Sequence, residues 1–191
     1  MRNAGKTDKD YMIPWTTNAQ IVFYNKTKFT ELGLKVPSTW DEFIKLAEAI
    51  KDKGEQPFIY TWKDAWTAKL LVNSLAGPTQ GDDFWQKLQK GTVTFSGSDA
   101  YKTTAKRMLE LKQYAQNDPF GTSYDDGNSQ FANGGSVLCI QGTWAIPVMK
   151  SVNPDIELGT FVLPTENKPD TTKLLSAPRF YHRRFKFDQE P

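Results

Sequence analysis

Residues 123–144 read SYDDGNSQFANGGSVLCIQGTW, and this stretch decides the fold class. A short helix is expected at residues 129–133 and ends at the glycine pair 134–135, because glycine readily adopts the backbone conformation that terminates helices. The apolar run 137–140 that follows predicts a buried strand. Gly142-Thr143 then turns into a helix of about ten residues. A helix, a buried strand and a second helix in succession are typical of an α/β protein.

The same alternation of strands and helices continues on both sides of this stretch. Short apolar runs predict three further strands, at residues 21–24, 57–61 and 160–163. Periodicity and capping residues predict further helices, at residues 39–53, 64–76, 82–90 and 98–116. The first of these helices has the strongest start signal, because Thr39 and Glu42 have the spacing of a capping box. These elements predict an α/β fold with a largely parallel sheet flanked by helices.

Composition argues against several classes of protein. The formal net charge is only +2, and residues 179–191, with four basic and two acidic side chains, account for it. This basic tail is expected to be disordered, and the neutral remainder argues against nucleic-acid binding. Cys139 is the single cysteine, so no disulfide within the chain and no cysteine-based zinc site is expected, and Cys139 itself is predicted to be buried. No catalytic motif, metal site or cofactor site is predicted.

Two turns that follow predicted strands carry tryptophan. Trp62, Asp64 and Trp66 follow the strand at 57–61, and Trp144 follows the strand at 137–140. Ligands of open α/β sheets bind beyond the carboxyl ends of the strands, where these turns lie. An aromatic ring can lie against the apolar C–H face of a sugar, while Asp64, Lys63 and Asn18 can bond to its hydroxyl groups. The turns therefore predict a sugar-binding site.

Core packing is the alternative interpretation of these tryptophans. Trp66 also fits the buried face of its helix, together with Leu70 and Leu75. Trp144 could hold a helix against the sheet, and spacing alone favours the core role for both residues. Two other tryptophans, Trp40 and Trp85, lie on amphipathic helices and are expected in the core.

Four segments in this order resemble family 1 extracellular solute-binding proteins of ABC sugar importers. They are YMIPWTTNAQIVFYNKTKF at 11–29, PSTWDEF at 37–43, FANGGSVLCIQGTW at 131–144 and FVLP at 161–164. The resemblance covers residues 11–178 and implies an incomplete periplasmic-binding-protein-like lobe of type II. It implies an inter-lobe crossing at 1–20, a second, C-terminal lobe at 21–164 and the start of a return crossing at 165–178. Family members are longer, so the chain is expected to be a fragment.

The resemblance also implies roles for individual residues and partners. Ligand contacts are expected from Trp144, Trp66, Tyr124 and Asn18, with Asp64 and Trp62 as further candidates. The implied ligand is an oligosaccharide, the implied partner is an ABC permease, and a monomer without enzymatic activity is expected. Full-length members are extracellular lipoproteins or periplasmic proteins, whereas the start of this chain shows no export signal. A fragment of a carbohydrate-active enzyme and an inert fragment are the two alternatives.

Overall fold

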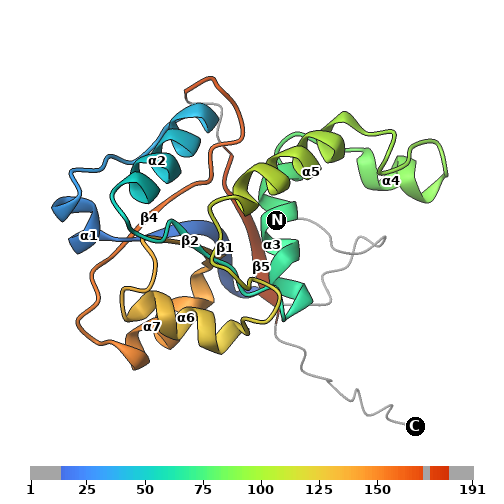
Figure 1. Cartoon of the computed structure of the whole chain (residues 1–191). Helices are drawn as coiled ribbons and strands as arrows, with labels where there is room; N and C mark the ends of the chain where they lie inside the picture. Colours follow the sequence, from blue (N-terminus) through green and yellow to red (C-terminus); the bar gives the residue numbers. More distant parts are fainter. Residues whose placement is uncertain (1–13, 170–172, 181–191) are drawn as a thin grey trace, which may run out of the picture.

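A mixed sheet of five strands lies between two layers of helices in the computed structural model, which describes residues 14–169 and 173–180 (Figure 1). The strands are β1 (Pro14–Asn25), β2 (Phe58–Ile59), β3 (Leu138–Gly142), β4 (Leu158–Phe161) and β5 (Leu175–Phe180). The helices are α1 (Lys26–Glu31), α2 (Trp40–Asp52), α3 (Ala65–Ala76), α4 (Phe84–Gln89), α5 (Asp99–Lys112), α6 (Tyr124–Ala132), the 3-10 turn η1 (Thr143–Ala145) and α7 (Ile146–Val152).

β1 is the central strand, and it runs against all of its neighbours. It pairs antiparallel with β3, β4 and β5, whereas β2 and β3 pair in parallel. The strand order is β2-β3-β1-β4, and β5 pairs with the N-terminal half of β1. The predicted α/β class is confirmed. The expectation of a largely parallel sheet holds for strand direction, since β2 to β5 point the same way, but most pairings are antiparallel because β1 lies in the middle.

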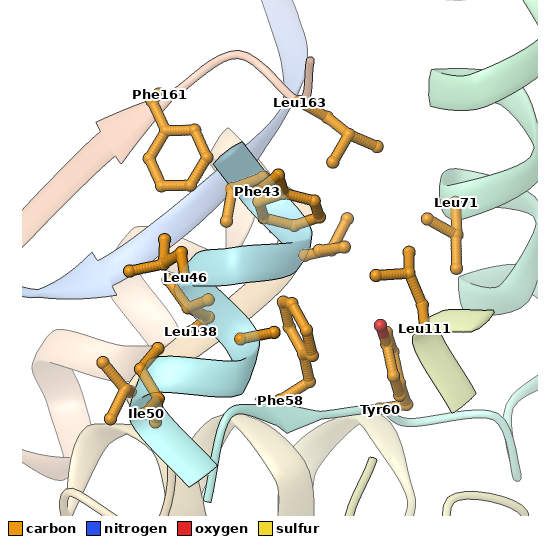
Figure 2. Packing of buried hydrophobic residues seen from close by; sticks show 14 of the residues in the cluster. Phe43, Leu46, Ile50, Phe58, Tyr60, Leu71, Leu111, Leu138, Phe161 and Leu163 are labelled. Atoms are coloured by element: carbon orange, nitrogen blue, oxygen red, sulfur yellow. The ribbon is translucent and has the colours of Figure 1, made fainter. Parts of the chain in front are cut away.

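Helices cover both faces of the sheet because consecutive apolar residues of a strand point to opposite faces. Val22 of β1 faces α2, α3 and α5, whereas Phe23 faces α6 and α7. Figure 2 shows the first of these two cores, in which Phe43 of α2, Phe58 of β2 and Leu111 of α5 pack together. The second core holds Cys139, as predicted, and burial raises the pKa of its thiol, which therefore stays protonated.

The helix starts follow the predicted capping chemistry with one correction. The Thr39 side chain accepts a hydrogen bond from the Glu42 N–H, as a capping box requires, although the Glu42 carboxylate bonds to Ser38 instead of Thr39. The helix expected at residues 129–133 is only the end of α6. This helix begins at Tyr124, because the Ser123 side chain accepts from the Asp126 N–H and two acidic residues in the first turn complement the helix dipole.

Two further expectations need correction. Trp40 is buried as predicted, but Trp85 is 51% exposed because α4 lies at the far end of α5, away from the sheet (Figure 1). The tail was expected to be disordered from residue 179, yet Arg179 and Phe180 belong to β5, whose backbone pairs with β1. The remaining tail, 181–191, and residues 1–13 of the expected crossing segment lie outside the described residues. None of the described helices combines the length and apolar character needed to cross a membrane.

Candidate binding site at the carboxyl edge of the sheet

Three aromatic side chains meet beyond the carboxyl ends of β2 and β3. Trp66 lies in the first turn of α3, Tyr124 is the first residue of α6, and Trp144 lies in η1 directly after β3. The ring centroids of Trp66 and Tyr124 are 5.1 Å apart, and those of Trp66 and Trp144 are 6.3 Å apart. The ring planes in these pairs are inclined by 45° and 44°. We call Trp66, Tyr124 and Trp144 the three-ring cluster.

The exposure of these rings separates the two interpretations of the tryptophans. Trp66 is 42% exposed, so it does not belong to the buried face of α3, where Leu70 and Leu75 do lie. Trp144 and Tyr124 are half-buried. Trp66 therefore presents ring surface to solvent at the edge where ligands bind in α/β folds, and the core interpretation fails for it.

Because residue 142 is glycine, the Trp144 ring can lie directly against the backbone of residue 142. A Cβ atom at residue 142 would lie 2.2 Å from atoms of the Trp144 ring, closer than any real contact. Glycine is therefore needed at residue 142 for the close approach of the Trp144 ring. It is not needed for the backbone conformation, because any residue can adopt a φ of -91°. The position of the Trp144 ring depends on the absence of a side chain at residue 142.

Asp64 connects the turn after β2 to the start of α6. It occupies the N-cap position of α3 but makes no side-chain bond to that helix. Its Oδ2 accepts the Tyr124 N–H instead, at 2.7 Å, which places this carboxylate beside the three-ring cluster. Burial, followed by the charge of Asp125, raises the pKa of Tyr124. The phenol consequently stays protonated at neutral pH and can donate a hydrogen bond.

Asn18 lies at the same edge because β1 runs antiparallel to β3. Gln20 is opposite Gly142, so residues before Gln20 extend past the end of β3. The Thr143 hydroxyl accepts the Ala19 N–H at 3.3 Å and lies 3.5 Å from Asn18 Oδ1. The structure thus brings Asn18 next to the residue that precedes Trp144.

Trp62, another predicted site residue, packs in a different direction. Its ring stacks on Tyr60 at 4.6 Å and contacts Phe120 at 5.3 Å, and it belongs to the core on the α2 side of the sheet. The structure therefore does not bring Trp62 into the three-ring cluster. Within residues 14–169 and 173–180, no group of His, Cys, Asp and Glu side chains is arranged to hold a metal ion.

Two buried polar residues lie beneath the cluster and were not predicted from the sequence. Gln141 at the end of β3 donates from Nε2 to Thr61 Oγ1, at 3.1 Å, and both side chains are buried. The available signal was position at the carboxyl edge, since Thr61 is the last residue of the predicted strand 57–61 and Gln141 directly follows the predicted strand 137–140.

Residues 1–178 match the family of bacterial extracellular solute-binding proteins. The chain belongs to this family. The resemblance seen in the sequence is thereby confirmed, and the family is one of binding proteins, not of enzymes.

Individual relatives agree with this assignment. The multiple sugar-binding protein of Streptococcus mutans serotype c is 38% identical over 169 residues, which are 82% of this chain and 39% of that protein. An ABC transporter extracellular-binding protein of Pyrococcus horikoshii is 22% identical over 81% of this chain and 36% of its own length. The structure of RafE in complex with raffinose is 33% identical, with a TM-score of 0.74 over 88% of this chain and 45% of RafE. The ligand-free structure of RafE from Streptococcus pneumoniae gives the same TM-score, 0.74. This solute-binding protein chain spans about two fifths of the length of the curated relatives it matches.

Proposed function

We propose that this chain is the sugar-contacting lobe of the solute-binding component of an ABC importer, and that its three-ring cluster holds an oligosaccharide. The single observation that carries the proposal is the convergence of Trp66, Tyr124 and Trp144 at the carboxyl edge of the sheet. Relatives that bind sugars support it, among them RafE with raffinose. The proposed partner is an ABC permease, and the proposed location is extracellular or periplasmic, as for named relatives.

The chemistry of the cluster suits a sugar. Pyranose rings have apolar C–H faces, and each well-formed contact with an aromatic ring contributes about 1 kcal/mol by analogy with aromatic pairs. Rings inclined by 44–45° line a bend instead of a flat platform, which suits a ligand with successive, differently oriented sugar rings. Asp64, Asn18 and the Tyr124 hydroxyl would bond to the sugar hydroxyl groups.

We also propose that residues 21–164 form the second lobe and that residues 1–20 and 165–178 are crossing segments. The pairing of β5 with β1 supports this division. Over residues 14–19, β1 pairs only with β5, beyond the positions at which it pairs with β3 and β4. Trp62 remains a proposed ligand contact outside the three-ring cluster. It would contact the ligand through the side of its ring that does not pack on Tyr60 and Phe120.

The test follows the indole N–H signals of the six tryptophans by proton–nitrogen NMR during titration with raffinose. We expect the signals of Trp66 and Trp144, assigned by substitution, to move with one common dissociation constant. Trp66→Ala and Trp144→Ala should each raise the raffinose dissociation constant, followed on the remaining indole signal, about fivefold, as loss of one aromatic contact would. Trp85→Ala is the matched control, because Trp85 is similarly exposed but lies on α4, and it should leave the titration unchanged.

Two results would contradict the proposal. The first is that the Trp66 and Trp144 signals of the folded chain stay fixed at raffinose concentrations up to about 50 mM, well above a millimolar dissociation constant. The second is that the Trp85 control raises the dissociation constant as much as Trp66→Ala does. Either result would show that the three-ring cluster is not the sugar site.

A further inference from the structure

The backbone ladder between β2 and β3 stops before the ring-bearing turns begin. β2 and β3 pair at only two positions, Phe58 with Leu138 and Ile59 with Cys139. Two residues further along the same register, Thr61 is opposite Gln141. There, the side-chain bond from Gln141 Nε2 to Thr61 Oγ1, at 3.1 Å, connects the two chain segments. This bond lies between the turn that leads to Trp66 and the turn that leads to Trp144.

Thr61 contacts α3 and α6, which carry Trp66 and Tyr124, and β3, which leads directly into the Trp144 turn. On the α3 side, the Thr67 hydroxyl donates to the Thr61 carbonyl at 2.6 Å. On the α6 side, a Cβ at Gly127 would lie 2.2 Å from Thr61 Cγ2, so α6 packs directly on this methyl group. On the β3 side, the Thr61 hydroxyl accepts from Gln141. A shift of Thr61 would therefore be transmitted to Trp66, Tyr124 and Trp144 together.

Packing alone does not explain an amide at residue 141. Gln141 is 1% exposed and Thr61 is 2% exposed, so their polar atoms are withdrawn from water. Gln141 Oε1 accepts no hydrogen bond from the described residues. Burial of an unpartnered carbonyl oxygen destabilises the folded state, a cost that leucine at the same position would avoid.

We infer that Thr61 and Gln141 are positioning residues that set the separation of the three rings and thereby the affinity for sugar. The part that concerns affinity rests on the proposed function, whereas the part that concerns ring separation does not. Neither residue needs to touch the ligand, because both act through Trp66, Tyr124 and Trp144.

The experiment compares Thr61→Val with Thr61→Ser and Thr104→Val in the 191-residue chain. Valine keeps the methyl contact with α6 but removes the hydroxyl that Gln141 bonds to, whereas serine keeps the hydroxyl. Thr104 is a buried threonine on α5 whose hydroxyl donates within its own helix, so Thr104→Val is the matched control. The first readout is the set of indole N–H signals without ligand, and the second is the raffinose dissociation constant.

We expect Thr61→Val to move the Trp66 and Trp144 signals without moving those of Trp40 and Trp85, and to weaken raffinose binding about 3- to 10-fold, as loss of one hydrogen bond would. Thr61→Ser should restore the signals and most of the affinity, and Thr104→Val should change neither. Unmoved Trp66 and Trp144 signals in folded Thr61→Val would overturn the inference. The indole N–H signals without ligand test ring positioning even if raffinose does not bind. Failure of the proposed sugar-binding function is therefore distinguishable from failure of this inference.

A second variant keeps the test decisive if Thr61→Val does not fold. The double substitution Thr61→Val with Gln141→Leu replaces both polar partners by apolar groups and leaves no amide unpaired, so it should recover stability. The shift of the Trp66 and Trp144 signals should persist in it, because the polar connection is still absent. Signals at their original positions in the folded double variant would show that the Thr61–Gln141 bond does not position the rings.

Discussion

At the scale of single residues, the three-ring cluster depends on two positions, 127 and 142, where a side chain would not fit. Trp144 can lie over residue 142 only because that residue is glycine, and α6 can approach Thr61 only because residue 127 is glycine. Both glycines lie next to ring-bearing segments. A methyl group at either position would therefore act on the three-ring cluster without altering any aromatic side chain.

Gly142→Ala should displace the Trp144 ring, because the added Cβ would lie 2.2 Å from its atoms. Loss of one aromatic stack corresponds to about 1 kcal/mol, so raffinose affinity should fall about fivefold. The Trp144 indole N–H signal should move by more than that of Trp40, which lies in the core. A titration indistinguishable from that of the unaltered chain would mean that Trp144 does not contact the sugar.

The sequence predicted most of the residues that the structure brings together in the candidate site but could not orient every ring. Trp66, Trp144 and Asp64 were placed in the candidate site because each follows a predicted strand, which is a local pattern, whereas the role of Asn18 was implied by the family resemblance. Trp62 was assigned to the site because it lies in the same turn. The spacing that orients it was nevertheless present, since Phe58, Tyr60 and Trp62 alternate along one face and stack at 5.6 Å and 4.6 Å. The Thr61–Gln141 bond joins residues 80 positions apart, and no local pattern reveals it.

At the scale of elements, a side chain closes the outer edge of β2. Gln116 accepts from the Tyr60 N–H at 2.9 Å and donates to the Tyr60 carbonyl, so its amide takes the place of a neighbouring strand. The Phe58 N–H bonds to the Tyr114 carbonyl on the same side. β2 is short, and these contacts extend its pairing toward Thr61.

Gln116→Ala should destabilise the chain by about 1–3 kcal/mol, because it leaves the Tyr60 N–H and carbonyl without partners. Urea denaturation measures this as a lower midpoint at unchanged slope. Gln113→Ala is the control, since Gln113 is an exposed glutamine at the C-cap of α5, three residues before Gln116. Equal midpoints for the two variants would refute a role of Gln116 at the strand edge.

Glu42 makes the start of α2 sensitive to pH. The N–H of Ser38 and then its hydroxyl lower the pKa of Glu42, so the folded state favours the ionised carboxylate. The resulting stabilisation is present above the ordinary pKa of glutamate and is lost as pH falls through the lowered value. Glu42→Gln should therefore lower Tm at neutral pH, and the difference should vanish in acid. Glu31→Gln controls for net charge; a Tm difference for Glu42→Gln that is independent of pH would be evidence against this account.

Helices were predicted better than strands, for a physical reason. Caps such as Thr39 are local, and α2, α3, α4 and α5 were found close to their observed bounds. The start of α6 was missed because the helix was expected only from residue 129, whereas Asp125 and Asp126 already form its first turn. β5 was missed because its sequence, LSAPRF, lacks an apolar run and is a strand only through its pairing with β1.

At the scale of the whole molecule, the chain offers one side of the proposed sugar site. Solute-binding proteins of this kind close two lobes around the ligand, and the relatives are more than twice as long as the matched region. Half of the contact free energy of a micromolar complex corresponds to a dissociation constant of about 1 mM. We therefore expect raffinose to bind this chain at millimolar concentration or more weakly. Isothermal titration calorimetry with Trp144→Ala as the weaker-binding control tests this, and a micromolar isotherm would contradict it.

The central position of β1 has a consequence for biosynthesis. β1 is the first described strand to leave the ribosome, yet its partners β3, β4 and β5 all come from the last third of the chain. Until Leu138–Gly142 have been translated, Ile21 and Phe23 have no strand beside them, and α6, the first helix of their core, is made only shortly before. The nascent chain thus carries an unpaired apolar strand through most of its synthesis, a state prone to aggregation that molecular chaperones recognise. The central strand of the sheet is therefore synthesised first, whereas the strands that pair with it are synthesised last.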